Sequence, residues 1–475
     1  MFHDRINKKF IIHIAAAVFW LVIWQAASTF TGLEFVLAGP VKVLFCLEEM
    51  LCESRTYVIL THSFLRISAG FLIAFPAAFA AGMLSFCYKT FKDFIDPLVV
   101  IMKSLPIAVF IILILMLTGS SMLSLVTSFI VTFPVVYYGV LEGMLNLDSG
   151  LAEMACVFSI KGIRKFRFII LPQCMPYVNA AAKTSIGMCW KAGAAAEIIG
   201  LPNFSIGEQL YLSKLYLQSD VLLSWGIIIV AAGVVSEKVF LYSFKKLVRM
   251  LSGFCHKPYE SRAGQQEVQS QHEEQQKNAH RIKVENVSKS YDGNKVLDNI
   301  SLNVNGGGRL CLMGKSGIGK TTLIRIILGL EKADRGNVVS SGGFSAVFQE
   351  STLCPWLSAA DNVCIVMKKG GGAYSYVRNV LAQLLDDEAV DKPAACLSGG
   401  MKRRCETVRA VLYDSSAVIL DEPFAGMDEN TKERTIQFIL DNINGRTLIV
   451  STHDEDDVKA LEAAAFVIDK NDNDC

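Results

Sequence analysis

The stretch RLCLMGKSGIGKTTLIRIIL, residues 309–328, decides the fold of the second half of the chain. Its first five residues are apolar enough for a buried strand, and the six apolar-rich residues 323–328 have the composition of a helix. Between them, Gly314 to Thr321 follow the pattern GxxxxGK[ST], in which glycines let backbone N–H groups surround phosphates at a helix N-terminus. The stretch therefore predicts a strand, a phosphate-binding loop and a helix in an α/β domain.

Each part of this loop has an expected task. Lys320 should reach the β- and γ-phosphates of a nucleotide, and the Thr321 hydroxyl should ligate Mg²⁺. The nucleotide-binding residues predicted here are Gly314, Lys315, Ser316, Gly317, Ile318, Gly319, Lys320, Thr321 and Thr322.

Two carboxylates follow a second apolar strand, residues 417–420. Asp421 is placed to hold Mg²⁺ directly or through water, and Glu422 can act as a general base or orient the water that attacks the γ-phosphate. Ahead of them in the chain, Ser398, Gly399 and Gly400 open a helix whose N-terminus suits a phosphate. The second half thus carries the parts of a nucleotide hydrolase.

Residues 397–404 (LSGGMKRR) match the ABC signature, with Met401 where Gln is more usual, and residues 281–475 resemble an ABC transporter nucleotide-binding domain. The resemblance implies that Tyr291 stacks on adenine and that Gln349 senses Mg²⁺ and contacts a permease. It also implies that Asp428 is the D-loop aspartate and His453 the switch histidine. On this basis the catalytic residues are Glu422, His453 and Gln349, the metal site is Thr321, Gln349 and Asp421, and the cofactors are ATP and Mg²⁺.

The residues before about Met250 consist mostly of long apolar runs. A membrane-spanning helix needs roughly 20 mostly apolar residues. The candidate spans are Ile11–Phe30, Ile67–Tyr88, Leu98–Leu117, Met122–Met144, Pro176–Ile199 and Leu222–Phe244. The stretch from Val41 to His62 is too polar to span and is expected to form an amphipathic helix on the outer surface, with Val43, Leu44, Leu47 and Leu51 on one face.

Loop charges predict the orientation of these spans. Lysines and arginines concentrate in the segments after the second, fourth and sixth runs, and the positive-inside rule places such loops in the cytoplasm. We therefore expect a multi-pass protein of the plasma membrane with both termini and the ATPase domain in the cytoplasm.

The internal loop after the fourth run carries a second motif. Glu153, Ala155, Ile169, Leu171 and Pro172 fall at the offsets of the EAA loop of binding-protein-dependent ABC import permeases, with Ser159 at the usual Gly position. We expect a short helix with Met154, Ala155, Val157 and Phe158 on its apolar face, docking in a groove of the ATPase. Leu171-Pro172 should end the turn at the membrane.

Further segments of the first half resemble permeases of the nitrate, sulfonate and taurine type, a group whose relatives also serve thiamine pyrimidine precursors. These segments are residues 63–71, 96–97, 103–108 and 190–197. The resemblance implies import of a small polar or anionic solute delivered by an extracytoplasmic solute-binding protein. An exporter, or a membrane-anchored ATPase with a sensing role, remains an alternative.

Three ionisable residues interrupt the fifth run: Lys183, Lys191 and Glu197. Charges in a bilayer usually face a cavity, pair together or lie near the interface. These three residues have two interpretations. In one they pair structurally or extend toward the membrane surface, and in the other they line a transport pathway in which Lys191 attracts an anionic solute.

The expected architecture is multi-domain. An all-α six-helix transmembrane permease, residues 1–251, precedes a polar Gln-rich linker, residues 252–280, and an α/β P-loop NTPase of the ABC cassette type, residues 281–475. In ABC ATPases the signature of one copy faces the phosphate loop of another, which implies a homodimer in the lipid bilayer. A net charge of +1 argues against nucleic-acid binding.

The 13 cysteines include no CxxC pair, so neither a zinc site nor a disulfide framework is predicted. A disulfide between Cys46 and Cys52 stays open.

Overall fold

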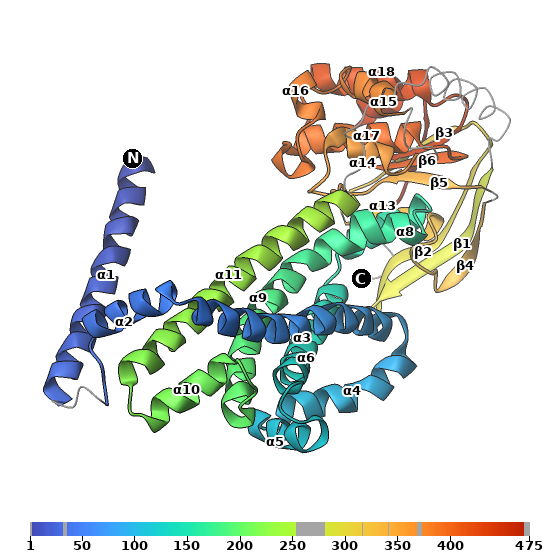
Figure 1. Ribbon diagram of the computed structural model, residues 1–475. Helices are drawn as coiled ribbons and strands as arrows, with labels where there is room; N and C mark the ends of the chain where they lie inside the picture. Colours follow the sequence, from blue (N-terminus) through green and yellow to red (C-terminus); the bar gives the residue numbers. More distant parts are fainter. Residues whose placement is uncertain are drawn as a thin grey trace. The chain divides into compact units, whose positions relative to one another are not determined.

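A computed structural model describes residues 2–31, 36–252, 281–315, 317–340, 342–367 and 373–469. The chain divides into two compact units. The first contains Met1–Asn146 and Cys174–Arg249, and the second contains Leu147–Gln173 and Met250–Cys475. Most of the expected linker and Ser316 lie outside the described residues. Figure 1 shows the elements of both units.

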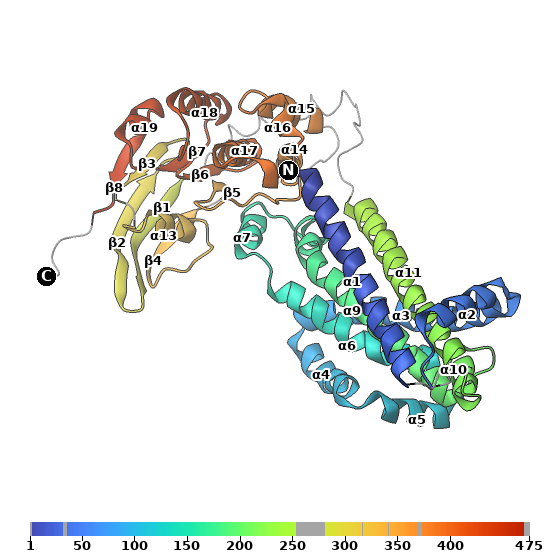
Figure 2. The ribbon, with the colours of Figure 1, turned by 90° about the vertical axis from the view of Figure 1, so that its left-hand side faces the viewer.

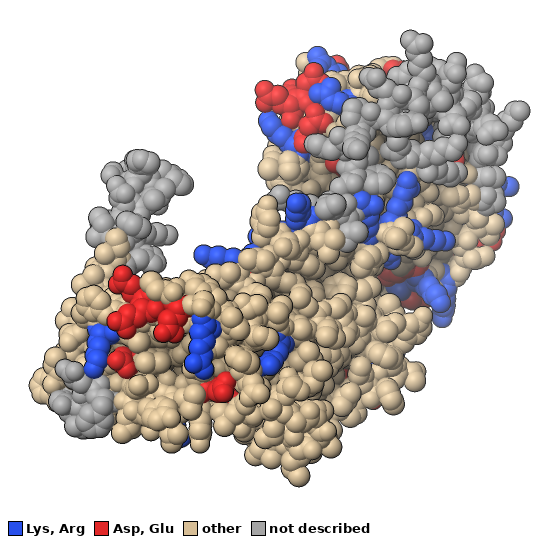
Figure 3. All heavy atoms as spheres, viewed as in Figure 1, with Lys and Arg blue, Asp and Glu red and all other residues tan. Residues whose placement is uncertain are grey.

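The first unit is built of helices. They are α1 (Phe2–Thr31), α2 (Pro40–Cys52), α3 (Ser54–Cys87), α4 (Lys89–Ser104), α5 (Ile107–Thr118), α6 (Leu123–Leu145), α9 (Leu171–Gly200), α10 (Ile206–Leu215) and α11 (Ser219–Ser252). Within the described part of the chain, α3, α6 and α11 are each long and apolar enough to cross a membrane. The face of this unit visible in Figure 3 carries few charged side chains. Both observations agree with a membrane domain.

The expected third span, Leu98–Leu117, is wrong as a single helix. The chain forms α4 and α5 instead, bent by 104° at the intervening break, so that the pair is one broken span or a re-entrant loop. Pro106 explains the break, because proline lacks an N–H group and pushes the residue before it, Leu105, out of the helical region.

The other predicted spans are occupied by helices, with corrections at their ends. The second begins at Ser54, well before the expected Ile67. The segment Val41–His62 is therefore not one surface helix, because Glu53 separates α2 from α3 in an extended conformation. Of the predicted apolar face of α2, Val43 is buried and Leu47 is half-buried, whereas Leu44 and Leu51 are exposed.

The second unit contains two sheets. An antiparallel sheet has the order β2-β1-β4, from β1 (Ile282–Tyr291), β2 (Asn294–Val304) and β4 (Arg335–Ser340). A parallel sheet has the order β5-β6-β7-β3-β8. Its strands are β3 (Arg309–Met313), β5 (Phe344–Val347), β6 (Ala417–Asp421), β7 (Thr447–Ser451) and β8 (Ala464–Val467). The expected strand 309–313 is confirmed, and the strand expected from Ala417 is β6.

Helices surround the parallel sheet. They are α13 (Lys320–Ile327), α14 (Ala359–Cys364), α15 (Ala373–Leu381), α16 (Asp387–Val390), η3 (Ala394–Cys396), α17 (Gly399–Leu412), α18 (Glu429–Asn442) and α19 (Glu455–Ala460). The segment that belongs to the permease motif adds α7 (Ser149–Val157), α8 (Gly162–Lys165) and the π-helical turn η1 (Phe166–Ile170).

Alternate residues of the central strands serve two cores. Leu310 and Leu312 of β3 belong to a cluster with Leu323 and Ile327 of α13, whereas Cys311 belongs to the cluster that contains α17 and α18. Figure 2 shows α13 on one side of the strands and α18 on the other. Because the strands are parallel, the carboxyl ends of β3 and β6 meet at one edge, where ligands bind in such sheets.

Candidate functional site

The phosphate-loop motif lies between β3 and α13, as its pattern predicts. Gly319 is the N-cap of α13 and has a φ of 110°, in the left-handed region that favours glycine. A Cβ at this position would lie 2.8 Å from Leu297 Cδ2 and 3.0 Å from the Val296 carbonyl oxygen. Both the backbone conformation and the space therefore require glycine here.

Lys320 points into the loop and is only 6% exposed. Its Nζ donates hydrogen bonds to the carbonyl oxygens of Gly314 at 2.6 Å and Lys315 at 3.1 Å. Of the remaining predicted loop residues, Lys315 and Gly317 are exposed, and Ile318, Thr321 and Thr322 are half-buried. The loop thus holds the Lys320 ammonium group among backbone groups that can surround phosphates.

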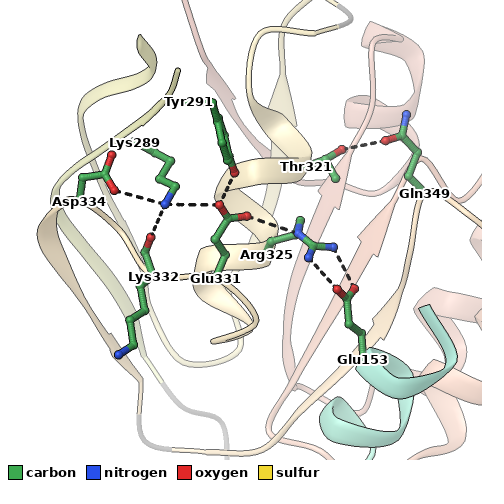
Figure 4. A network of polar contacts seen from close by, with 9 residues as sticks. All are labelled: Glu153, Lys289, Tyr291, Thr321, Arg325, Glu331, Lys332, Asp334 and Gln349. Atoms are coloured by element: carbon green, nitrogen blue, oxygen red, sulfur yellow. Dashed lines mark hydrogen bonds and ion pairs between the residues drawn. The ribbon is translucent and has the colours of Figure 1, made fainter. Parts of the chain in front are cut away.

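Asp421 ends β6 beside the loop. It is buried and accepts a hydrogen bond from the Ser451 hydroxyl. Burial raises the pKa of Asp421, and the neighbouring Glu422 carboxylate raises it further, against the hydrogen bonds from Ser451 and Thr321. Thr321 Oγ1 in turn donates to Gln349 Oε1 at 3.2 Å (Figure 4). A hydroxyl, an amide oxygen and a carboxylate are hard oxygen donors of the kind that Mg²⁺ prefers, so these residues fit the metal.

Glu422 follows directly with a φ of 49°, which is unusual for a residue with a side chain. Its N–H group donates to Ser451 Oγ at 2.9 Å, so one hydroxyl on β7 bonds both consecutive acidic residues. A left-handed residue directly after a buried strand turns the chain sharply at the site. Strain of this kind gathers at functional positions.

His453 is exposed just beyond β7, in a segment held from α18. Lys432 Nζ lies 2.6 Å from Asp454 Oδ2 and 2.6 Å from Asp457 Oδ1. The hydrogen bond from Lys432 holds the pKa of Asp454 below its ordinary value. Lys432 therefore fixes the turn that carries His453 relative to the helix that follows Asp428.

Ser398, Gly399 and Gly400 contribute to a second pocket. Ser398 caps α17 and accepts from the Met401 N–H at 3.3 Å, and Asp428 caps α18 and accepts from the Thr431 N–H at 3.2 Å. Hydrogen bonds from Thr431 keep the pKa of Asp428 low. The described residues that line this pocket come from these two segments and include none of the phosphate loop. The structure therefore brings the predicted residues together in two groups.

Tyr291 ends β1 with its ring 42% exposed. Lys289 Nζ lies over the ring, 5.3 Å from its centroid, and the hydroxyl donates to Glu331 Oε1. One side of the ring is thus occupied by a cation, and stacking of a base would use the other.

The permease-type motif forms a helix inside the core of this unit. Leu151, Met154, Ala155 and Phe158 join the same hydrophobic cluster as α14, α15 and α17, and Val157 is half-buried. Ser159, at the position where the motif usually has Gly, has a φ of 52°. The expected amphipathic helix is therefore present, and its apolar face also includes Leu151.

Polar contacts hold the middle of this helix and the π-helical turn that follows it. The Arg325 guanidinium donates to Glu153 Oε1 at 2.7 Å and Oε2 at 2.9 Å, a two-point ion pair from α13 (Figure 4). Trp356 Nε1 donates to the Phe168 carbonyl oxygen at 2.9 Å. Ile169 and Leu171 are buried, but the expectation that Leu171-Pro172 ends a turn is wrong, because both residues begin α9. α9 continues directly from η1, so Pro172, which lacks an N–H group, follows a π-helical turn where the regular helical hydrogen-bond pattern already changes.

Comparison with known proteins shows two family matches. Residues 67–249 match the model for the binding-protein-dependent transport system inner membrane component, and residues 297–425 match the ABC transporter model. An aliphatic sulfonates import ATP-binding protein of Delftia acidovorans is 37% identical over 196 residues, which are 39% of this chain and 79% of that protein. The chain belongs to the ABC transporter family. It is an importer subunit in which a permease domain and an ATP-hydrolysing domain share one polypeptide.

Two other relatives and one solved structure are also similar to this ABC transporter. Sulfonate-import ATP-binding proteins of Corynebacterium glutamicum and Yersinia pestis are each 33% identical, over 39% and 40% of this chain and 79% and 73% of those proteins. Among solved structures, a dimeric ATP-binding cassette with bound ADP and Pi is 25% identical over 39% of this chain and 94% of its own length, with a TM-score of 0.36.

In the transporter's helical unit, Glu197 is completely buried in α9. Its carboxylate accepts hydrogen bonds from Ser63 Oγ at 2.7 Å, Ser124 Oγ at 3.2 Å and the Gly207 N–H at 3.4 Å. Lys183 and Lys191 lie on the exposed face of α9. Glu197 therefore packs α9 against α3, α6 and α10, while the two lysines face outward.

Several residues of the transporter's ATP site carried no motif signal. Each of these residues lies near a recognised motif in sequence, but each has a partner 22 to 172 positions away: Ser451 with Asp421, Lys432 with Asp454, Arg325 with Glu153 and Glu331 with Tyr291. Only the polar character of Ser451 at the end of an apolar strand could have pointed to it. Cys46 and Cys52 are free thiols, so the disulfide between them is not formed.

Proposed function

We propose that this chain is a half-transporter that imports a small anionic organic solute, of the sulfonate class, with ATP as the energy source. The observation that supports it best is the docking of the Glu153 segment, a permease motif, into the hydrophobic core of an ATPase whose relatives are named for sulfonate import. Within the same family, nitrate and the pyrimidine precursors of thiamine are the alternative solutes.

In the proposed cycle, Lys320 and the loop Gly314–Thr322 bind the phosphates of ATP, and Tyr291 receives the adenine on its open side. Thr321, Gln349 and Asp421 would hold Mg²⁺, which neutralises phosphate charge when bound. Glu422 orients the attacking water and accepts its proton, and His453 contacts the γ-phosphate. These assignments follow the geometry in which the acidic residues, the loop and Gln349 surround one edge of the parallel sheet.

One chain supplies one phosphate loop and one signature pocket, and these are separate groups of residues. We therefore propose a homodimer, in which Ser398–Gly400 and Asp428 of each copy complete the ATP site of the other. In each chain the proposed permease is 1–251, the linker 252–280 and the ATPase domain 281–475, with both termini and the ATPase in the cytoplasm. An extracytoplasmic solute-binding protein delivers the solute.

The exposed lysines of α9 support the proposal that the solute is an anion. Lys191 and Lys183 stand eight positions apart on an exposed face, and lysines are costly against lipid, so this face should line water or a partner subunit. Lys191 would then attract an anion in the pathway. Normal uptake of the true solute by Lys191→Met at wild-type expression would remove this assignment.

Native mass spectrometry of the full-length complex, purified through a tag on this chain, tests the assembly. The Glu422→Gln variant should bind ATP but lose nearly all turnover, which stabilises the closed form. We expect two copies of this chain with one extracytoplasmic binding protein, whose bound solute is then identified. A different half-transporter in place of the second copy contradicts the homodimer, and an empty complex that extrudes solute contradicts import.

A further inference from the structure

Glu331 lies in the loop that follows α13, between two cationic side chains and Tyr291. Its Oε1 accepts the Tyr291 hydroxyl and lies 3.4 Å from Lys289 Nζ, while its Oε2 lies 3.5 Å from Arg325 Nε. Figure 4 shows the carboxylate at the centre of this arrangement. One carboxylate oxygen therefore contacts Tyr291 and Lys289, while the other contacts Arg325.

Arg325 continues the chain of contacts. The guanidinium presents its Nε to Glu331 and its two terminal nitrogens to the Glu153 carboxylate at 2.7 and 2.9 Å. Because a guanidinium is planar, its orientation toward one carboxylate fixes its orientation toward the other. A displacement of Glu331 would rotate the group that holds Glu153.

The Tyr291 end of this series of contacts is also restrained. Lys289 lies over the Tyr291 ring and donates to the Lys332 carbonyl oxygen at 2.9 Å and to Asp334 Oδ1 at 3.2 Å. Tyr291 can therefore change position only together with its contact to Glu331 or with Lys289. The contacts run without interruption from the exposed ring to the permease-type helix α7.

We propose that Glu331 is a positioning residue that links occupancy of the Tyr291 ring by adenine to the grip of Arg325 on Glu153. The link rests on the proposed function, in which Tyr291 receives the base. A base that stacks on the Tyr291 ring would hold the Tyr291 hydroxyl in place. The hydroxyl would then hold the Glu331 carboxylate, and that carboxylate would hold the Arg325 guanidinium. The nucleotide would thus influence the docked permease segment from the base end of the molecule, in addition to its phosphate end.

The charge of Glu331 is needed for this role. Partial burial opposes ionisation, but hydrogen bonds from Tyr291 and Lys289 outweigh it and hold the pKa of Glu331 below its ordinary value. A carboxylate accepts from Tyr291, Lys289 and Arg325 at once. The amide of a glutamine has one acceptor oxygen and would repel one of the cations with its N–H₂ group.

A double-mutant cycle in the full-length transporter, reconstituted in proteoliposomes, tests the link. Tyr291→Phe removes the hydroxyl but keeps the ring, and Glu153→Gln weakens the other end. If the ends communicate, their effects on solute imported per ATP should depart from multiplicativity by about threefold or more. In the Glu331→Gln background the two effects should multiply independently. Asp298→Asn, which removes an exposed ion pair with Lys295, is the control background and should leave the departure intact.

Two results separate the inference from the function it rests on. An unchanged KM for ATP in Tyr291→Ala contradicts the adenine contact itself. A raised KM in that variant, together with multiplicative effects in the wild-type background, overturns the link alone. Should Glu331→Gln fail to fold, Arg325→Lys replaces it as the background, because it keeps the charge but not the planar fork.

Discussion

Phe158, at the end of α7, should be the strongest single determinant of how the permease segment stays docked. Its side chain is 2% exposed in the ATPase core. The Tyr413 ring packs edge-on against it with centroids 5.1 Å apart, and the Arg409 guanidinium lies 5.0 Å from the ring centroid. Arg409 lies in α17, the helix that begins at the signature, and Tyr413 is the residue that follows its end.

The magnitude follows from these contacts. Replacing a buried Phe with Ala costs about 3–5 kcal/mol in protein cores, which includes the cavity left behind. The Glu153 ion pair at the middle of α7 is partly exposed and contributes only about 1 kcal/mol. Since 1.4 kcal/mol is a factor of ten, Phe158→Ala should shift the docking equilibrium by roughly 10²- to 4 × 10³-fold. Phe158→Leu keeps most of the apolar area and loses about 0.5–1.5 kcal/mol of aromatic contact.

The assay compares full-length variants in nanodiscs and proteoliposomes. Hydrogen exchange of residues 149–158 reports docking, and solute imported per ATP hydrolysed reports coupling. We expect Phe158→Ala to lose amide protection and import while it still hydrolyses ATP, and Phe158→Leu to be intermediate. Val157→Ala, at the half-buried neighbour, is the matched control and should behave almost as wild type. Unchanged protection and unchanged import per ATP in Phe158→Ala would refute the reasoning.

Three further changes have defined outcomes. Gly319→Ala places a Cβ 2.8 Å from Leu297 at a φ of 110°, so nucleotide affinity, measured with a fluorescent ATP analogue, should fall about tenfold or more. Gly207→Ala places a Cβ 2.2 Å from the Glu197 backbone, and the overpacking of about 1–3 kcal/mol or more should lower the thermal midpoint, whereas Gly226→Ala, with open space, should not. Lys432→Met leaves two carboxylates without their cation and should lower kcat with little change in the KM for ATP, and Lys432→Arg should restore it; equal loss in both variants contradicts the positioning of His453.

The ATP-binding edge was predictable because its chemistry is local in the chain. Gly314 to Thr321 form one continuous motif in the sequence, and Asp421 and Glu422 are consecutive at the end of an apolar strand. Periodicity identifies the two segments as strands. Because the strands are parallel, their carboxyl ends lie at the same edge of the sheet. The residues around the predicted Mg²⁺ donors, such as Ser451, were missed because a lone serine carries no pattern.

The helical unit was predictable in outline and not in detail. Apolar runs of sufficient length located the helices, but hydropathy does not register that Pro106 divides one run into two helices bent by 104°. The same limit applies to α2, whose predicted apolar face contains both Val43, which is buried, and Leu44, which is exposed. Which of several apolar positions is covered depends on neighbouring helices, and composition contains no information about them.

The amino-acid sequence alone was enough to establish three features: an ATPase with a phosphate loop, an apolar multi-helix domain and a permease motif at Glu153. Three-dimensional packing was needed to show that this motif lies inside the ATPase core, with Arg325, 172 positions away, holding its glutamate. It was also needed to show that Glu331 joins Tyr291 to the same arginine. The reason is physical: a motif is a pattern within one segment, whereas an ion pair exists only where folding brings two segments within a few ångströms.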